Sequence, residues 1–254
     1  MTDTSGKVAL VTGSTRGIGR AIALRLAEAG YDIAVHGRSP EGPSRANAEA
    51  VCEEVRALGR RAAPFAADIA NKEQIGDLMD AIDAEFGRLD TLILNAARAP
   101  FKETTRLMER DLRQLVENNL FGHVFCVQKA KPLLERAGGH IVFISSLGSR
   151  YMNAQYPLGT MKAAMEAMVR QWAEELAPQR ISSNAVCAGL VKTDSYKTLR
   201  RLWPELAELP EEAFVSPEAV ADVVAFLCDE GSRAIAGQTL IVDNGLSNRI
   251  LRTR

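Results

Sequence analysis

Short apolar runs alternate with longer amphipathic stretches along almost the whole chain of 254 residues. The apolar run 7–11 precedes a stretch at 16–30 in which Ile18, Ile22 and Leu26 recur every four residues, and this stretch ends at a glycine. Apolar runs that lack a polar face predict strands buried on both sides, as in a parallel sheet that helices cover on both faces. The chain is therefore expected to form one α/β domain.

The same pattern predicts the elements along the chain. Strands are expected at residues 7–11, 31–36, 61–67, 89–95, 140–145, 181–187 and 238–243. Helices are expected at 16–30, 46–59, 72–86, 109–135 with a bend near Pro132, 158–176 and 217–228. Parallel sheets of this kind bind ligands beyond the carboxyl ends of their strands, so the residues that carry chemistry are expected there.

Composition excludes several classes of function. Lys and Arg number 31 against 32 Asp and Glu, and this balance argues against a broad basic face for nucleic acid and against a polybasic membrane anchor. The four cysteines form no CxxC pair and the three histidines show no ligand spacing, so we expect reduced core thiols and no metal site. Without a signal-peptide core or an apolar run of membrane-spanning length, a soluble cytoplasmic protein is expected.

A glycine-rich turn is the clearest local motif. Gly13, Gly17 and Gly19 lie between the first expected strand and the first expected helix. Glycines there let the backbone approach a pyrophosphate, which the free N–H groups and the dipole of a helix N-terminus favour. The spacing is GxxxGxG, and a plain structural turn would also use glycines. The strand–turn–helix context nevertheless favours a dinucleotide site.

The end of the second expected strand bears on the choice of dinucleotide. NAD sites usually carry an acidic residue there, which binds the ribose 2′-hydroxyl. This strand ends in His36, Gly37 and Arg38 instead, and Arg16 lies within the glycine turn. Two guanidinium groups suit a 2′-phosphate by charge and by geometry. Although both arginines could be ordinary surface residues, the pattern favours NADP(H) over NAD(H).

Beyond these motifs, the chain resembles the short-chain dehydrogenase/reductase family over essentially its whole length. The similar segments follow one another in the family's order. After the glycine turn, Asp68 resembles the acid that contacts the adenine, and Asn95 lies in a segment that resembles NNAG, with Leu94 replacing the first Asn. Asn119 resembles the active-site Asn, and Ser146 stands where the catalytic Ser belongs. Residues 184–189 with Thr193 resemble NxVxPG…T, with Ala188 replacing Pro, and residues 242–245 resemble the closing VDGG.

The resemblance implies a Rossmann-type, doubly wound parallel sheet of about seven strands in the order 3-2-1-4-5-6-7, with helices on both faces. It implies a cofactor site made by Gly13, Ser14, Thr15, Arg16, Gly17, Ile18, Gly19, Arg38, Asp68, Ile69, Asn95, Lys162, Gly189, Val191 and Thr193.

Assembly is also implied by the resemblance, because family members commonly pair the helices that follow the fourth and fifth strands. A homodimer or homotetramer is therefore expected. Met161, Met165, Met168 and Trp172 give the helix at 158–176 an apolar face at helical spacing, which could pair with a second copy or lie buried within its own subunit.

The family's YxxxK motif is altered in this chain. Lys162 stands where the catalytic Lys belongs, but the residue four positions earlier is Leu158, which cannot donate a proton. The nearest tyrosines are Tyr156 and Tyr151, six and eleven residues before Lys162. Pro157 biases Tyr156 toward an extended conformation just ahead of the helix. Tyr156 is therefore the first candidate acid and Tyr151 the second.

A stretched Tyr–Lys spacing resembles that of the family's enoyl-thioester reductases, and residues 138–149 are similar to the enoyl-acyl-carrier-protein reductase III group. The resemblance implies NADPH-dependent reduction of the C=C bond of an enoyl thioester of coenzyme A or acyl-carrier protein. Tyr156 would stabilise the enolate and Lys162 would hold the nicotinamide ribose. Ser146 would orient the substrate or the tyrosine, and Asn119 would support the lysine. The alternatives are a carbonyl reductase and a non-catalytic member of the family.

A substrate lid is expected at about residues 194–216, within a single domain that spans 1–254. This stretch has the length of a functional loop. Its apolar residues suit an acyl chain or a ring, although ordinary helix packing would also explain them; they are Leu199, Leu202, Trp203, Leu206 and Leu209.

Overall fold

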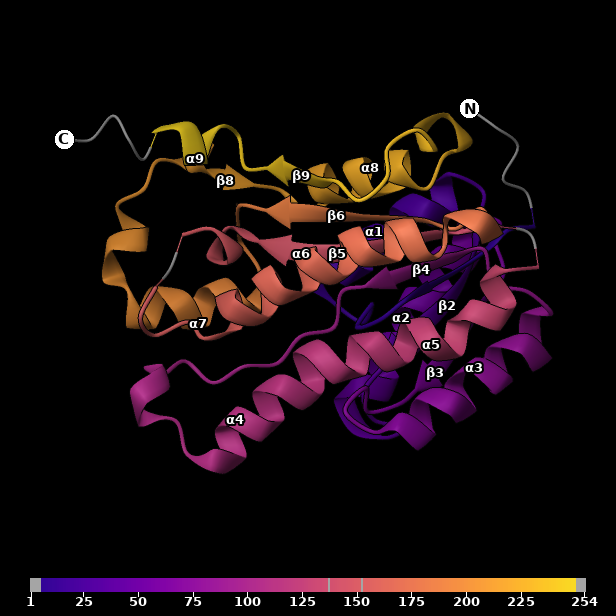
Figure 1. The fold of residues 1–254 in the computed structure, drawn as a ribbon, viewed down its shortest axis with the longest axis horizontal. Helices are drawn as coiled ribbons and strands as arrows, with labels where there is room; N and C mark the ends of the chain where they lie inside the picture. Colours follow the sequence, from indigo (N-terminus) through magenta and orange to yellow (C-terminus); the bar gives the residue numbers. More distant parts are fainter. Residues whose placement is uncertain (1–5, 137, 152, 250–254) are drawn as a thin grey trace.

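Seven parallel strands form the central sheet of the computed structural model, which describes residues 6–249 except 137 and 152 (Figure 1). In sheet order they are β3 (Ala62–Ala66), β2 (Asp32–Gly37), β1 (Val8–Val11), β4 (Thr91–Leu94), β5 (His140–Ser146), β6 (Ser182–Ala188) and β9 (Thr239–Val242). Each neighbouring pair is parallel. The predicted order is confirmed, with β9 as the seventh strand of the sheet.

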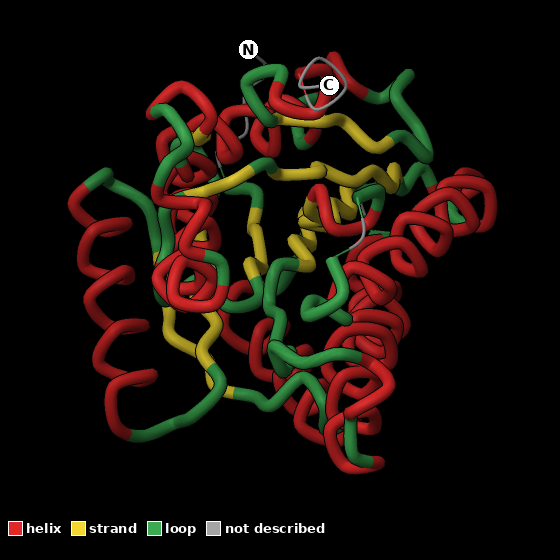
Figure 2. Tube along the Cα trace, turned by 90° about the vertical axis from the view of Figure 1, so that its left-hand side faces the viewer, coloured by secondary structure: helices red, strands yellow, loops and turns green. Residues whose placement is uncertain are grey.

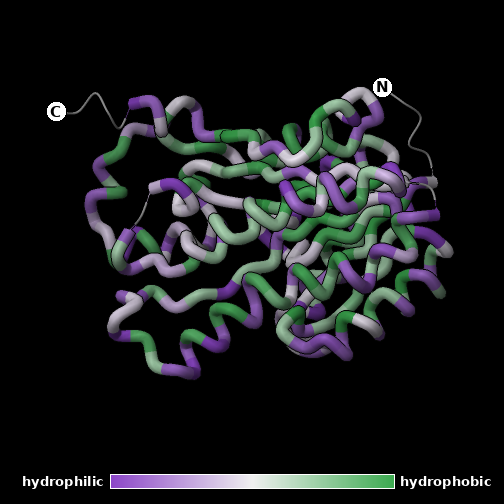
Figure 3. Tube along the Cα trace, viewed as in Figure 1, coloured by the Kyte–Doolittle hydropathy of each residue, from purple (hydrophilic) through white to green (hydrophobic). Residues whose placement is uncertain are grey.

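Helices cover both faces of this sheet. They are α1 (Gly17–Glu28), α2 (Gly42–Ala57), α3 (Lys72–Phe86), α4 (Glu109–Val116), α5 (Gly122–Leu134), α6 (Leu158–Glu175), α7 (Asp194–Leu202), α8 (Pro217–Leu227) and α9 (Leu246–Arg249). Successive strand residues point to opposite faces, so Ala9 and Val11 pack with α1, α2 and α8. Val8 and Leu10 pack with α3, α5 and α6. Figure 2 shows strands between the two groups of helices, and Figure 3 shows the hydrophobic strands at the centre.

Two predicted helices differ from the observed ones. The helix expected from residue 46 begins at Gly42, because Gly42 turns the chain at φ +65° and Pro43 fits a first helical turn. The helix expected at 109–135 consists of α4 and α5 joined by a π-helical turn at Glu117–Phe121. Pro132 lies inside α5, more than two helical turns after the irregular turn, and the bend near it stays a prediction.

Two short strands escaped the sequence analysis. β7 (Leu190–Val191) and β8 (Phe214–Val215) pair in parallel outside the main sheet. β7 precedes the 194–216 segment and β8 lies near its end. Between them the segment contains α7 and two 3₁₀ turns at Pro204–Ala207 and Glu211–Ala213. In Figure 1 this segment lies on the side toward which the strand arrows point. It therefore borders the edge of the sheet where ligands are expected.

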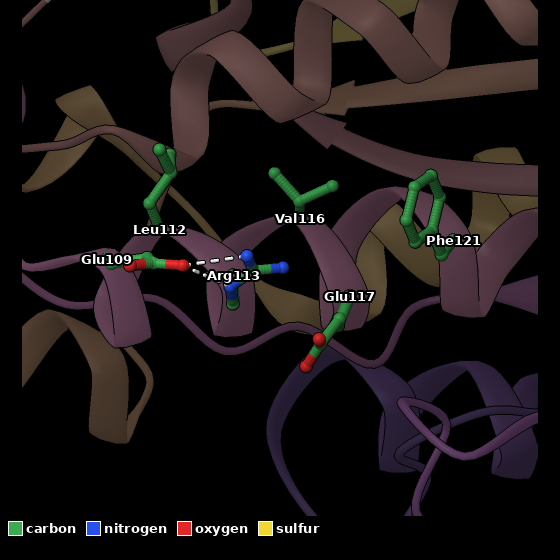
Figure 4. Close-up of a pocket in the computed structure, with 6 residues that line it drawn as sticks. All are labelled: Glu109, Leu112, Arg113, Val116, Glu117 and Phe121. Carbon is green, nitrogen blue, oxygen red and sulfur yellow. Dashed lines mark hydrogen bonds and ion pairs between the residues drawn. The ribbon is translucent and has the colours of Figure 1, made fainter.

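The apolar residues of α6 and α4 differ in exposure. Met165 and Trp172 are buried in the core of their own subunit, so this part of the apolar face on α6 is internal. By contrast Leu112 and Phe121 are each 50% exposed. With Val116 they line a surface pocket, and Figure 4 shows these three side chains on one side of the helix.

The four cysteines are all buried and free, which agrees with the expectation of reduced core thiols. Within the described residues, no helix is both long and apolar enough to cross a membrane.

Candidate active site

The glycine turn joins β1 to α1 and leaves the N-terminus of α1 open. Gly13 and Gly17 have φ values of +69° and +55°, in the left-handed region that favours glycine. A Cβ atom on Gly19 would lie 2.3 Å from the Gly13 carbonyl oxygen, so this position admits only glycine. Because no side chain caps α1, the amides of its first turn are available to a phosphate group.

Thr12 and Asn95 hold this turn against the end of β4. The Thr12 Oγ1 accepts the backbone amides of Asn95 at 2.9 Å and Ala96 at 3.1 Å, and donates to the Ile93 carbonyl at 3.0 Å. The Asn95 side-chain amide donates to the carbonyls of Thr12 at 2.9 Å and Gly13 at 3.2 Å. Asn95 thus fixes the shape of the turn together with Thr12, a partner that the sequence motifs did not reveal.

His36 is a second support of the turn that the sequence analysis missed. The Gly13 amide donates to His36 Nδ1 at 3.0 Å, and Nε2 lies 3.0 Å from the Ala67 carbonyl. These partners require a neutral ring with its proton on Nε2. Burial lowers the pKa of His36 to about 4, so the ring stays neutral at pH 7. The sequence signal that could have indicated this role is a polar residue, His36, within a strand expected to be buried.

Arg38 and Asp68 face each other on the rim of the predicted cofactor site. Nε and one terminal nitrogen of Arg38 lie 2.9 and 2.8 Å from the same Asp68 oxygen. Arg16 lies 3.6 Å from Asp194 at the start of α7, and both side chains are exposed. The sheet thus brings the two arginines and Asp68 to its carboxyl edge, as the sequence predicts.

The other predicted cofactor residues line the same edge. Ser14 is buried, and its Oγ accepts the His36 amide at 2.9 Å. The Gly189 amide donates to the Val242 carbonyl at 2.8 Å. Thr193 precedes α7, and its Cγ2 lies 3.4 Å from the point that a Cβ on Gly17 would occupy. Thr15, Ile18, Ile69 and Val191 are partly or fully buried.

Lys162 is buried on the second turn of α6. Its Nζ donates to the Ile144 carbonyl at 2.5 Å and lies 4.6 Å from the centre of the Phe143 ring. Burial lowers the pKa of Lys162 to about 8, while Cys187 and Glu166 act in the opposite direction. The ammonium group therefore remains mostly charged at pH 7 and puts a fixed positive charge beside the carboxyl end of β5.

Tyr156 lies in the turn before α6, beside Ser146. A Cβ on Gly148 would lie 3.0 Å from two ring carbons of Tyr156 and 3.3 Å from Ser146 Oγ, so all three groups meet at one point. Burial raises the pKa of Tyr156, and the nearby Ser146 hydroxyl offsets part of this effect. The Ser146 Oγ nevertheless makes no hydrogen bond of normal geometry within the described chain. Tyr156 therefore stays protonated at neutral pH next to an unpaired hydroxyl.

Tyr151 and Leu158 occupy different surroundings. Tyr151 is 43% exposed, and its hydroxyl lies 3.5 Å from the Ser247 carbonyl in α9. Leu158 is the first residue of α6 and is buried, one helical turn before Lys162. The structure thus brings Tyr156, but not Tyr151, against Ser146.

Asn119 lies in the π-helical turn and joins it to the loop after β4. Its side-chain amide donates to the carbonyls of Arg98 at 2.6 Å and Leu115 at 2.8 Å, and its oxygen accepts the Arg98 amide at 3.1 Å. The Asn118 amide bonds the Gln114 carbonyl in the same way at 2.9 Å. Because both side chains engage carbonyls four residues back, the backbone widens into a π turn, which is often found at functional sites.

Two further aromatic rings surround Tyr156. Phe101, in the loop after β4, stacks on the Tyr156 ring with centres 5.8 Å apart. Trp203, at the end of α7, approaches it edge-on at 6.3 Å. Three segments far apart in sequence therefore form one aromatic wall, of which the sequence analysis named only Trp203 and Tyr156.

Comparison with known proteins identifies the family. A family model described as enoyl-(acyl carrier protein) reductase matches residues 13–247. A short-chain dehydrogenase from Mycobacterium paratuberculosis, solved with NAD bound, superposes with a TM-score of 0.85 at 27% identity, covering 97% of this chain and 100% of that one. The chain belongs to the short-chain dehydrogenase/reductase family.

Two curated relatives are named as reductases of acyl groups carried as thioesters. A 3-oxoacyl-acyl-carrier-protein reductase (FabG) from Staphylococcus aureus is 34% identical over 244 residues, which cover 94% of this chain and 98% of the relative. A 1-cyclohexenylcarbonyl-CoA reductase from Streptomyces collinus is 36% identical over 248 residues, which cover 95% and 87%. As a short-chain dehydrogenase/reductase, the chain is an oxidoreductase.

Proposed function

We propose that this oxidoreductase uses NADPH to reduce the C=C bond of an α,β-unsaturated thioester. The observation that carries the proposal is that Leu158 stands one helical turn before Lys162 while Tyr156 lies beside Ser146. Leu158 is buried on the same face of α6 as Lys162, one helical turn earlier, and its side chain cannot donate a proton. Tyr156, two residues ahead of the helix and beside Ser146, would supply the hydroxyl instead.

The residues of the glycine turn fit a nicotinamide dinucleotide. A Cβ on Gly19 would fill the space that the backbone keeps clear, and α1, which begins at Gly17, has no side-chain cap over the amides of its first turn. Arg38 and Arg16 would pair with the 2′-phosphate, because guanidinium groups suit it by charge and by geometry and both lie at this rim. When bound, the nicotinamide supplies a hydride.

Tyr156 and Lys162 would stabilise the negative charge that develops on the thioester oxygen. Since burial raises the pKa of Tyr156, its phenol remains a hydrogen-bond donor at neutral pH. The buried Lys162 ammonium adds a fixed positive charge, whose effect is stronger away from bulk water. Asn119 would keep the loop after β4 against the π turn and so preserve the wall of the site.

The 194–216 segment would serve as the substrate lid. β7 and β8 fix its two ends, and Trp203 reaches back to the Tyr156 ring. Phe101 and Trp203 would contact the acyl group on either side of the acid. The relative that acts on 1-cyclohexenylcarbonyl-CoA supports an unsaturated acyl thioester, of coenzyme A or of acyl-carrier protein.

Ketone reduction is the second candidate. The unpaired Ser146 hydroxyl beside Tyr156 could orient a ketone oxygen, and the Staphylococcus aureus relative is a 3-oxoacyl reductase. Ketone reduction needs a donor at the oxygen of the carbon that accepts the hydride. The buried Leu158 side chain occupies the helix face from which such a donor would normally act.

The test compares crotonyl with acetoacetyl thioesters, each on coenzyme A and on acyl-carrier protein, by following NADPH oxidation. We expect crotonyl turnover to exceed acetoacetyl turnover by about a hundredfold, the usual contribution of one positioned acid. Leu158→Tyr returns a hydroxyl to the helix face of Lys162 and should gain acetoacetyl reduction. Faster wild-type reduction of the ketone would overturn the proposal in favour of the second candidate.

We also propose that the protein forms a homodimer or homotetramer. The support is the apolar row of exposed Leu112, partly buried Val116 and exposed Phe121 along α4 and the π turn. Leu112→Glu should shift the mass measured by light scattering toward the monomer. A wild-type monomer at every concentration would contradict this assembly.

A further inference from the structure

A buried carboxylate lies one helical turn beyond Lys162 and takes no part in the chemistry proposed above. Glu166 is only 7% exposed, four residues after Lys162 on α6. A carboxylate in the interior is costly unless hydrogen bonds and opposite charge compensate it. Its partners therefore indicate what the residue does.

Within the described residues, the hydrogen-bond and ion-pair partners of Glu166 lie on the short segment 145–150 at the end of β5. The hydroxyls of Ser145 and Ser149 donate to the same carboxylate oxygen, Oε1, at 2.5 and 2.6 Å. A terminal nitrogen of Arg150 lies 3.6 Å from the other oxygen, Oε2. One side chain on α6 thus holds both ends of the segment, and its hydrogen bonds are of the stronger, charge-assisted kind.

The same segment carries the groups that surround the candidate acid. Ser146 follows Ser145 directly, and a Cβ on Gly148 would touch both Ser146 Oγ and the Tyr156 ring, at 3.3 and 3.0 Å. The Gly148 carbonyl oxygen lies so close to α6 that a Cβ on Gly159 would be 2.2 Å from it. A shift of this segment would therefore displace Ser146 and Tyr156 together.

We infer that Glu166 is a positioning residue that ties the 145–150 segment to the helix carrying Lys162, and so fixes Ser146 and Tyr156 relative to that lysine. The inference rests on the proposed reductase function but not on the choice between C=C and C=O substrates. It is tested with whichever thioester the wild type reduces. Failure of the enoyl proposal and failure of this inference are therefore distinguishable.

The charges around Lys162 provide a readout that simple loss of packing would not change. The titratable groups that face Lys162 are Glu166 on its own helix, Cys187 on β6 and His123 on α5. Burial holds the pKa of His123 at about 3 and raises that of Cys187 to about 11, so both are neutral at pH 7. Arg150 is the cation that faces Glu166. Removing the carboxylate should therefore lower the pKa of Lys162 from about 8.

The experiment compares Glu166→Ala and Glu166→Gln with Glu174→Ala, which alters an exposed acid on the same helix. At pH 6.5 we expect Glu166→Ala to lower kcat by about ten- to a hundredfold, as small misplacements of a catalytic group do. The dissociation constant of NADPH should stay within about twofold, because the glycine turn is untouched. Glu166→Gln keeps an oxygen for both serine hydroxyls and should recover most of kcat, and Glu174→Ala should match the wild type.

Two further measurements complete the test. The high-pH limb of kcat should move to lower pH in both Glu166 variants, because each lacks the charge that supports the lysine. Amide hydrogen exchange in residues 145–151 should accelerate at least about fivefold in Glu166→Ala but not in Glu174→Ala, a readout that needs no substrate. A folded Glu166→Ala protein with wild-type kcat, an unmoved limb or unchanged exchange in this segment would overturn the inference.

Discussion

Lowering the pH from 7 to 5 should destabilise this protein strongly, because all three of its histidines are buried. Burial lowers the pKa from 6.5 to about 4 for His36 and His140 and to about 3 for His123. The unfolded chain therefore binds protons across this pH range that the folded chain does not. Stability must then fall as the pH falls below 6.5.

The size of the effect follows from these pKa values. At pH 5 the unfolded chain should hold about 2.7 more protons on its histidines than the folded chain does. The free energy of unfolding should then fall by about 4 kcal/mol per pH unit near pH 5, and by about 6 kcal/mol in all between pH 7 and pH 5. This is a large fraction of the stability of an ordinary domain.

Urea unfolding at pH 7, 6 and 5 measures this slope, and His123→Leu is the informative variant. Both ring nitrogens of His123 lack a hydrogen-bond partner in the described part of the chain, so the substitution leaves no protein group unpaired. It should reduce the proton uptake by about one and stabilise the protein at pH 5 relative to the wild type. A wild-type uptake below about one proton, or the same slope in His123→Leu, would refute the reasoning.

Two further substitutions test the cofactor site. Gly19→Ala would put a Cβ 2.3 Å from the Gly13 carbonyl oxygen and should abolish NADPH binding measured by fluorescence. In the control variant Gly76→Ala the Cβ would meet only Lys129 at 3.7 Å, so this protein should bind NADPH normally, and its α3 should be about 0.5–1 kcal/mol more stable. Arg38→Leu should weaken NADPH by about tenfold or more and leave NADH unchanged, while Arg45→Leu on α2 should alter neither; equal losses for both nicotinamides would argue against a 2′-phosphate contact.

Apolar periodicity predicted a parallel sheet covered by helices on both faces, and the position of the glycine turn predicted the edge at which the candidate site lies. The strand order followed from the resemblance to the family. The sequence also predicted that α6 begins at Leu158, with Tyr156 ahead of it, since Pro157 marks that boundary. The π turn at Asn119 could not be predicted in this way. It depends on bonds to the Arg98 backbone, in a loop twenty-one residues earlier in the chain.

The periodicity of apolar residues also could not predict Glu166 or the β7–β8 pair, which support the candidate site. A glutamate at position 166 in an amphipathic helix normally faces solvent, and only the folded segment 145–150 reveals that Glu166 is buried. The strands β7 and β8 have two residues each, which is too short for an alternation of apolar and polar residues to be recognised. These features arise from tertiary contacts that local patterns do not encode.

The central claim is that Tyr156 replaces the missing hydroxyl at position 158. The most direct measurement is the single-turnover rate of NADPH oxidation with the preferred thioester, in Tyr156→Phe beside Tyr151→Phe. Tyr156→Phe should lower this rate by about 10²–10⁴-fold without changing NADPH affinity, because the hydroxyl acts on the substrate. Tyr151→Phe should keep the wild-type rate, since that hydroxyl lies against Ser247. The opposite pattern, with Tyr156→Phe fully active and Tyr151→Phe impaired, would contradict the account.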